Sequence, residues 1–243
     1  MGSQFGFLAK LGVMQNLASG LVACVDPVII HNMEKYSAIL KIFYYTAIED
    51  IQGDYLEFGV YTGSSFCHAL RCCKKTLKYG KQVWNSSKAR TRFFGFDSFE
   101  GFGEVSEGDK HPFFEDSNFA TSYEKVQKRV APFRKHFDVK LIKGFYNESL
   151  HAGPAAMGIE KARIIFVDCD TYTAAKDVFE FCAPIVQEGT IIVLDDRVCY
   201  KGNREAGVTR AFEEFKNYSG ASTRLFSLYG MGAGIQIVSG LKR

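Results

Sequence analysis

The sequence predicts an α/β three-layer sandwich built on a mostly parallel β-sheet. Two apolar runs rich in β-branched residues, 164–167 and 190–194, are typical of strands buried on both faces. The segment between them is long enough for a crossover helix, and because such crossovers are right-handed, the two strands lie parallel. Similar strand and helix patterns alternate along most of the chain. The carboxyl ends of these strands therefore meet at one edge of the sheet.

The elements follow in a regular order. Residues 7–17 form a weak amphipathic stretch and residues 35–48 a stronger one, so the first 50 residues are expected to be helical. Two short-linked strands near the end of the chain are expected to pair antiparallel. The remaining order is strand 54–60, helix 63–78, strand 92–96, helix 121–133, strand 139–142, strand 164–167, helix 173–182, strand 190–194, helix 205–216, and the closing strands 223–228 and 234–238.

Length and composition narrow the class of protein. The 243 residues fit one sizeable α/β domain with an added helical segment. A net charge of +3 is too small to argue for nucleic acid or an anionic membrane as a partner. No apolar run approaches the roughly 20 residues that span a bilayer. The seven cysteines form no CxxC pair, which favours reduced thiols in a cytoplasmic protein over a zinc site.

Three carboxylates stand where the two opening strands end. Asp168 follows the first strand, and Asp195 and Asp196 follow the second. Clustered carboxylates repel one another unless a cation neutralises them, and an all-oxygen site suits Mg²⁺, Ca²⁺ or Mn²⁺. The alternative is that they are strand-end residues that cap helices. Asp170, two residues past the strand end, is expected to cap the helix 173–182.

A glycine turn links the first strand to its helix and reads Glu57-Phe58-Gly59-Val60-Tyr61-Thr62-Gly63-Ser64-Ser65. Such a turn lets a ligand approach the backbone and offers helix N-terminal amides to an anionic group. It lacks the GxGxxG spacing, so it suits a ligand with a carboxylate better than one with a pyrophosphate. About 34 residues further on, Asp97 ends the second strand, where its carboxylate can accept hydrogen bonds from both hydroxyls of a ribose.

The segments EFGVYTGSS, FFGFDSFEGF and FVDCDTY…VLDD, in that order, resemble the class I S-adenosylmethionine-dependent O-methyltransferases. The resemblance covers roughly residues 54–207 and is nearest to the macrocin- and novobiocin-tailoring (TylF-type) group. It implies a three-layer, Rossmann-like methyltransferase sandwich whose mostly parallel seven-stranded sheet ends in a C-terminal antiparallel hairpin. The chain is therefore expected to divide into an N-terminal helical segment, 1–50, that forms a lid, an interface or both, and a methyltransferase domain, 51–243.

The resemblance also implies residues that bind S-adenosylmethionine. Asp97 would bind the ribose, with Ser98 beside it near the adenine. Asn147, in the turn 144–148, would border the adenine. The residues around the methionine half would be Glu57, Gly59, Tyr61, Thr62, Gly63 and Ser65.

A second set of residues would hold a divalent metal ion, most simply Mg²⁺: Asp168, Asp195 and Asp196. Similar enzymes use the ion to hold a substrate hydroxyl against the methyl donor. Asp168 would also accept the departing proton as the catalytic base. Catechol-type relatives carry a lysine three residues after the first metal aspartate, where this chain has Thr171. The base is therefore Asp168 or a side chain from elsewhere.

The irregular segment 99–120 has the length of a functional lid. Its His111 either approaches the substrate as an additional base or is an exposed loop histidine. Its aromatic residues either cover an apolar acceptor or pack the segment onto the domain. These aromatic residues are Phe99, Phe102, Phe113, Phe114 and Phe119.

The expected activity is metal-dependent transfer of the methyl group of S-adenosylmethionine to a hydroxyl of a small acceptor, which by resemblance is a sugar of a natural product. The expected partner is this hydroxylated small molecule, with no nucleic acid and no membrane, and the N-terminal segment leaves a homo-oligomer open. One alternative is a metal-dependent nucleotide-sugar glycosyltransferase, suggested by Asp168-x-Asp170, which leaves the glycine turn and Asp97 unexplained. The other is a non-catalytic S-adenosylmethionine-binding protein, against which the complete aspartate set argues.

Overall fold

The computed structural model describes residues 12–77, 91–114 and 119–242. Its centre is a seven-stranded sheet in the order β3-β2-β1-β4-β5-β7-β6. The first five strands run parallel, whereas β7 runs antiparallel to both β5 and β6. The strands are β1 (Asp54–Phe58), β2 (Phe93–Asp97), β3 (Val139–Lys143), β4 (Ala162–Val167), β5 (Ile191–Leu194), β6 (Ala221–Tyr229) and β7 (Ala233–Leu241). The predicted sheet and its antiparallel hairpin are confirmed.

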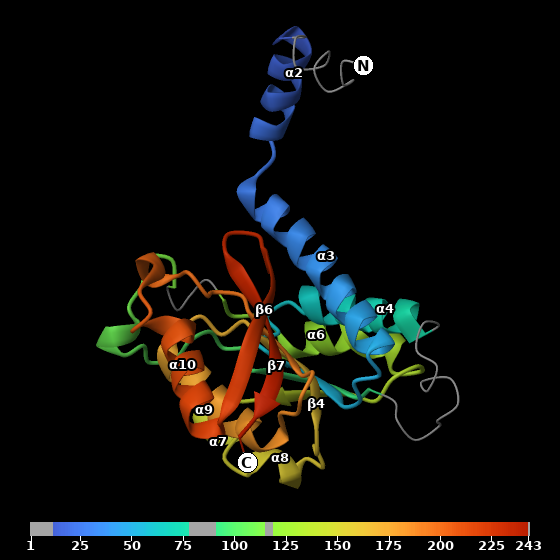
Figure 1. Ribbon diagram of the computed structural model, residues 1–243, viewed down its shortest axis with the longest axis vertical. Helices are drawn as coiled ribbons and strands as arrows, with labels where there is room; N and C mark the ends of the chain where they lie inside the picture. Colours follow the sequence, from blue (N-terminus) through green and yellow to red (C-terminus); the bar gives the residue numbers. More distant parts are fainter. Residues whose placement is uncertain (1–11, 78–90, 115–118, 243) are drawn as a thin grey trace.

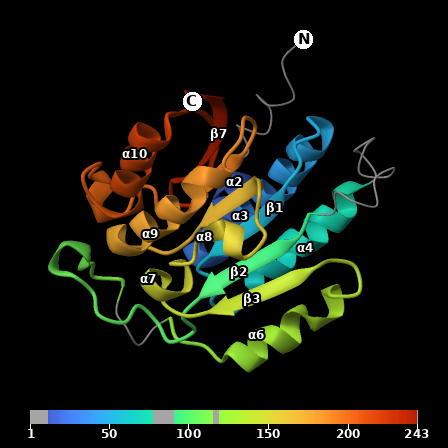
Figure 2. The same ribbon diagram turned by 90° about the horizontal axis from the view of Figure 1, so that it is seen from below.

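Helices cover both faces of the sheet, which completes the three predicted layers (Figure 2). On one face pack α3 (Pro27–Ile48), α4 (Ser64–Thr76) and α6 (Tyr123–Val130), and on the other pack α9 (Tyr172–Cys182) and α10 (Gly207–Ser219). Successive residues of a strand point to opposite faces. Tyr55 therefore enters the core under α3 and α4, whereas its neighbour Leu56 enters the core under α9 and α10.

Several boundaries differ from those expected. α3 begins at Pro27 rather than at residue 35, because the Asp26 side chain accepts a hydrogen bond from the Val28 N–H and caps the helix, and Pro27 suits its first turn. Two short helices, α7 (Tyr146–Ser149) and α8 (Gly153–Ala156), were not predicted between β3 and β4. Parts of three expected segments, 7–11, 78 and 115–118, lie outside the described residues.

The first described helix, α2 (Gly12–Ala23), extends away from the body of the protein and buries none of its residues (Figure 1). Within the described part of the chain, no single helix is long and apolar enough to cross a membrane. Only α2 and α3 taken together reach that length and composition, across a bend of 87°. The role of the segment 1–50 as a lid or an interface stays a prediction.

Candidate active site

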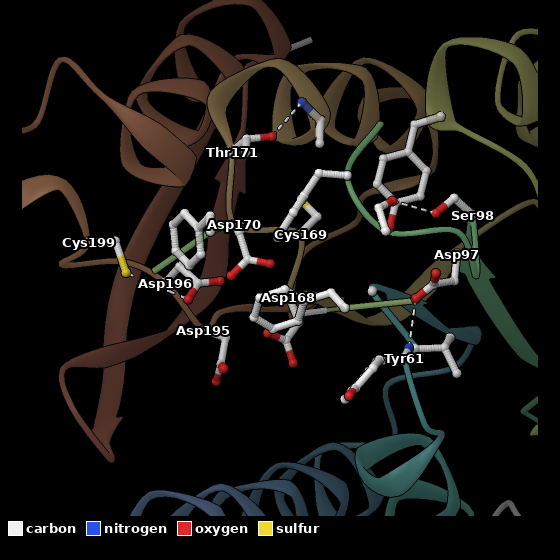
Figure 3. Close-up of a pocket in the computed structure, with 18 of the residues that line it drawn as sticks. Tyr61, Asp97, Ser98, Asp168, Cys169, Asp170, Thr171, Asp195, Asp196 and Cys199 are labelled. Carbon is white, nitrogen blue, oxygen red and sulfur yellow. Dashed lines mark hydrogen bonds between the residues drawn. The ribbon is translucent and has the colours of Figure 1, made fainter. Parts of the chain in front are cut away.

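A cavity of about 1070 Å³ opens at the carboxyl ends of the parallel strands. Its walls come from the turns that follow β1 to β5, from the loop after β2, and from the first turns of α3. Ligands bind at this edge in open α/β sheets because the strand ends leave a crevice there. Figure 3 shows Asp97 and Tyr61 on one side of the cavity and a group of aspartates on the other.

The turn after β1 lies against the end of β4 so closely that only glycine fits. Gly59 has a φ of +95°, and a Cβ atom there would lie 1.7 Å from the backbone oxygen of Asp168. The backbone on either side is fixed, because the Gly59 N–H donates to Phe96 O at 3.0 Å and the Asp168 N–H donates to Phe58 O at 2.9 Å. This packing places the glycine turn and the first aspartate side by side.

The substitution Gly59→Ala is expected to lower the free energy of unfolding by more than about 3 kcal/mol, because a clash with backbone adds to the strain of a positive φ. Denaturant titration measures the change. Gly153→Ala is a matched control, since Gly153 also has a positive φ of +73° but has open space around the added Cβ. We expect the control to lose only about 1–2 kcal/mol. Equal losses in the two variants would contradict the account of the turn.

Asp97 ties the β1 turn to the β2 turn across the cavity wall. Its Oδ2 accepts the Tyr61 N–H at 2.7 Å and its Oδ1 accepts the Phe99 N–H at 2.6 Å. Burial raises the pKa of Asp97, against these backbone hydrogen bonds, which lower it. Ser98 also lines the cavity, but its hydroxyl donates to Gly101 O at 2.7 Å and so stabilises its own turn. Asn147 lies on α7 in the same wall.

Glu57 lies beneath the glycine turn and does not line the cavity. It is fully buried, and its two carboxylate oxygens accept hydrogen bonds from Ser65 Oγ at 2.6 Å and from the Tyr55 hydroxyl. Burial raises its pKa to about 7, although both hydrogen bonds act to lower it. Glu57 therefore stabilises the glycine turn through its hydrogen bond with Ser65. Of the residues expected around the methionine half, those in the wall are Gly59, Tyr61, Thr62 and Ser65, whereas Glu57 and Gly63 are not.

The three expected metal ligands come together. Asp168 follows β4 and Asp195 and Asp196 follow the neighbouring β5, and each offers an oxygen within 4.8 Å of the others. Burial raises the pKa of Asp168 and Asp196, and neighbouring carboxylates raise both further. Asp196 Oδ2 is buried and has no hydrogen-bond partner among the described residues. A buried oxygen without a partner in an all-oxygen cluster fits a hard divalent cation.

Three side chains outside the predicted set contact Asp168 or Asp195, and they lie on α3 or on the β6–β7 hairpin. Lys35 Nζ lies 3.0 Å from Asp168 Oδ2 and 2.7 Å from Asp195 Oδ2. His31 Nε2 lies 3.4 Å from Asp195 Oδ2, and the Tyr229 hydroxyl donates to Asp195 Oδ1. Burial raises the pKa of Asp195, but these contacts outweigh it and hold the pKa below its usual range.

The prediction that Asp170 caps the following helix is wrong. Thr171 caps α9 by accepting the Ala174 N–H at 3.3 Å. Asp170 has a φ of +64°, and its side chain lies beside Asp196 (Figure 3). Burial and the neighbouring carboxylates raise its pKa to about 8. The left-handed backbone aims this carboxylate at the acidic cluster instead of at the helix.

The loop after β2 is held onto the N-terminus of α9. Asp109 is 2% exposed, and its carboxylate accepts the Tyr172 N–H at 2.7 Å and the Thr173 N–H at 3.2 Å. The favourable interaction of a carboxylate with helix N-terminal amides explains this contact. His111 is half-buried, lines the cavity and stacks on Phe114 with ring centroids 4.4 Å apart, so it is not an exposed loop histidine.

Comparisons with known proteins agree with this geometry. The family described as "Methyltransferase domain" matches residues 56–197, which include the glycine turn and all three aspartates. The mycinamicin III 3''-O-methyltransferase of Micromonospora griseorubida is 24% identical over 197 residues, which are 77% of this chain and 70% of that protein.

Solved structures show the same fold. The O-methyltransferase NovP superimposes with a TM-score of 0.64 at 18% identity, covering 85% of this chain and 80% of that chain. The calicheamicin methyltransferase CalS11 superimposes with a TM-score of 0.65 at 22% identity, covering 92% of this chain and 86% of that chain.

Proposed function

The chain belongs to the methyltransferase domain family and is an S-adenosylmethionine-dependent O-methyltransferase, and from that premise we propose that it methylates a sugar hydroxyl at a divalent-ion site formed by Asp168, Asp195 and Asp196. The observation that carries the proposal is the buried, unpartnered Asp196 Oδ2 within a cluster of three carboxylates. Asp196 lines the same cavity as Gly59 of the glycine turn.

The proposed cofactor site lies between the glycine turn and Asp97. A carboxylate has about four lone-pair positions, and backbone N–H groups occupy one on each oxygen of Asp97. The remaining positions can accept both ribose hydroxyls. The methionine half of the cofactor would lie along Gly59, Tyr61 and Thr62. That position is next to the end of β4, where Asp168 lies.

The proposed metal ligands are Asp168, Asp195 and Asp196. A bound divalent ion would lower the pKa of the acceptor hydroxyl and hold it in place. Within this cluster Asp168 is the member that packs against the glycine turn, so its carboxylate is the group placed to accept the proton that leaves the hydroxyl. Residues of the loop held by Asp109 line the same cavity.

Support for a sugar acceptor comes from the relatives and from the size of the cavity. One relative is a mycinamicin III 3''-O-methyltransferase, and one solved structure, with a TM-score of 0.58, is a TDP-rhamnose 3'-O-methyltransferase. Pockets for single small ligands span about 300–1,000 Å³. The cavity of about 1070 Å³ lies just above this range, which is large enough for the cofactor with a small acceptor group beside it.

Incubation with S-adenosylmethionine, Mg²⁺ and a panel of acceptors tests the function. The panel contains nucleoside-diphosphate deoxysugars, glycosylated macrolides and aminocoumarins, and a catechol as the control. We expect a product heavier by one methyl group from a sugar-bearing acceptor, with the new methyl on a sugar oxygen by NMR. Methylation of the catechol alone would contradict the proposed acceptor class.

A further inference from the structure

Lys35 brings a positive charge from α3 into the acidic cluster. We propose that the Lys35 ammonium and a divalent cation are alternative occupants of the Asp168–Asp195 carboxylate pair, so that α3 carries a built-in competitor for the metal. This inference rests on the proposed function, because it assumes that the aspartates bind a divalent ion.

Lys35 contacts carboxylate oxygens of two of the proposed metal ligands. Its Nζ lies 3.0 Å from Asp168 Oδ2 and 2.7 Å from Asp195 Oδ2, and its side chain is largely buried. Burial lowers the pKa of Lys35, but the two carboxylates outweigh it and hold the pKa above its usual range, so the side chain stays charged. Both hydrogen-bonded oxygens belong to residues that the metal would need.

Simultaneous occupancy is unfavourable for two physical reasons. Mg²⁺ binds oxygens at about 2.0–2.1 Å in a near-octahedral shell, which leaves little room for an ammonium on the same oxygens. An ammonium and a divalent cation a few ångströms apart also repel each other, and the repulsion is twice that between two single charges because it scales with the product of the charges. The ammonium carries one charge against the three aspartates, and it leaves Asp196 Oδ2 without a partner. Lys35 thus offsets only part of the repulsion that a divalent ion would remove.

The backbone of α3 is fixed beside the site, so the exchange requires a change of the Lys35 side chain alone. The Gly230 N–H donates to Glu34 at 2.5 Å, and the Met231 N–H donates to His31 Nδ1 at 3.3 Å. On the other side of the helix, the Tyr36 hydroxyl lies 2.9 Å from Ser64 Oγ. The flexible four-carbon stem of a lysine can swing into the cavity without moving the helix.

Mn²⁺ binding to the full chain, followed by the electron paramagnetic resonance signal of free Mn²⁺, tests the proposal without acceptor or turnover. Lys35→Met is expected to bind Mn²⁺ at least about tenfold more tightly than the wild type, because the competing charge is gone. Lys35→Gln is a second neutral variant that keeps a hydrogen-bond donor. Lys35→Arg keeps the charge and should bind like the wild type. Lys41→Met, the same change at an exposed position of the same helix, is the matched control.

The outcomes separate this inference from the proposed function. If the wild type binds Mn²⁺ and neither neutral Lys35 variant binds it more tightly than Lys41→Met does, the competition is wrong and the metal site stands. If neither the wild type nor the neutral variants bind Mn²⁺, the metal site itself is wrong and the inference falls with it. Thermal unfolding of each variant, with and without Mn²⁺, gives a second readout, and we expect the largest Mn²⁺-induced rise in Tm for Lys35→Met.

Discussion

Asp196→Asn is expected to reduce the rate of methyl transfer by about a thousandfold, because loss of a metal ligand removes several kcal/mol of charge stabilisation from the transition state. Asp168→Asn should have at least the same effect, since it removes both a ligand and the proposed proton acceptor. S-adenosylmethionine affinity should stay unchanged in Asp196→Asn, because Asp97 and Tyr61 of the proposed cofactor site lie on the other side of the cavity (Figure 3). Initial rates and calorimetry measure the two quantities.

The effect on stability distinguishes this loss from simple misfolding. Neighbouring carboxylates and burial both disfavour the charged form of Asp196, so its neutral replacement should not lower the Tm in metal-free buffer. Mg²⁺ should raise the Tm of the wild type and should have little effect on Asp196→Asn. Asp138→Asn, at an exposed position before β3, is the control. Undiminished activity of Asp196→Asn would contradict the metal site.

Asp97→Asn is expected to weaken S-adenosylmethionine binding by about a hundredfold. Hydrogen bonds to a charged group contribute about 1.5–3 kcal/mol each, and two of them to the ribose would be lost or weakened. The side-chain NH2 of the variant would also replace one carboxylate oxygen that now accepts a hydrogen bond from the Tyr61 or Phe99 N–H. Two donors would then face each other, and this loss of a hydrogen bond would loosen the β1 turn or the β2 turn.

Calorimetric titration with S-adenosylmethionine measures this change directly. Ser98→Ala serves as the comparison, because the Ser98 hydroxyl already donates to Gly101 O in its own turn. We expect a much smaller loss of affinity for that variant. Equal affinities in the wild type and Asp97→Asn would show that the ribose is held elsewhere.

Much of the fold could be predicted because its central strands are buried on both faces. Strands such as β4 and β5 consist of apolar, β-branched runs, and their carboxyl ends must meet when a crossover helix joins them. The grouping of Asp168 with Asp195 and Asp196 follows from that rule alone. The short helix α7 has only four residues, too few to show a helical period in the sequence.

Contacts between residues far apart in the sequence could not be predicted from local sequence patterns. Lys35 donates a hydrogen bond to Asp168, which lies 133 residues further along the chain. Asp109 accepts one from Tyr172 at the start of α9, 63 residues further along. A signal for Lys35 was present, because it lies at i, i+4 and i+7 with Ile39 and Ile42 on the buried face of α3. A lysine on a buried stripe needs a negative partner. Which carboxylates supply it depends on how α3 docks.

Methyl transfer to a sugar-bearing acceptor in the presence of a strong chelator, followed by addition of Mg²⁺, tests the central claim most directly. With S-adenosylmethionine bound in both conditions, we expect the rate to fall to background in chelator and to return when Mg²⁺ exceeds it. Full activity in chelator, with the cofactor bound, would contradict a metal-dependent role for Asp168, Asp195 and Asp196.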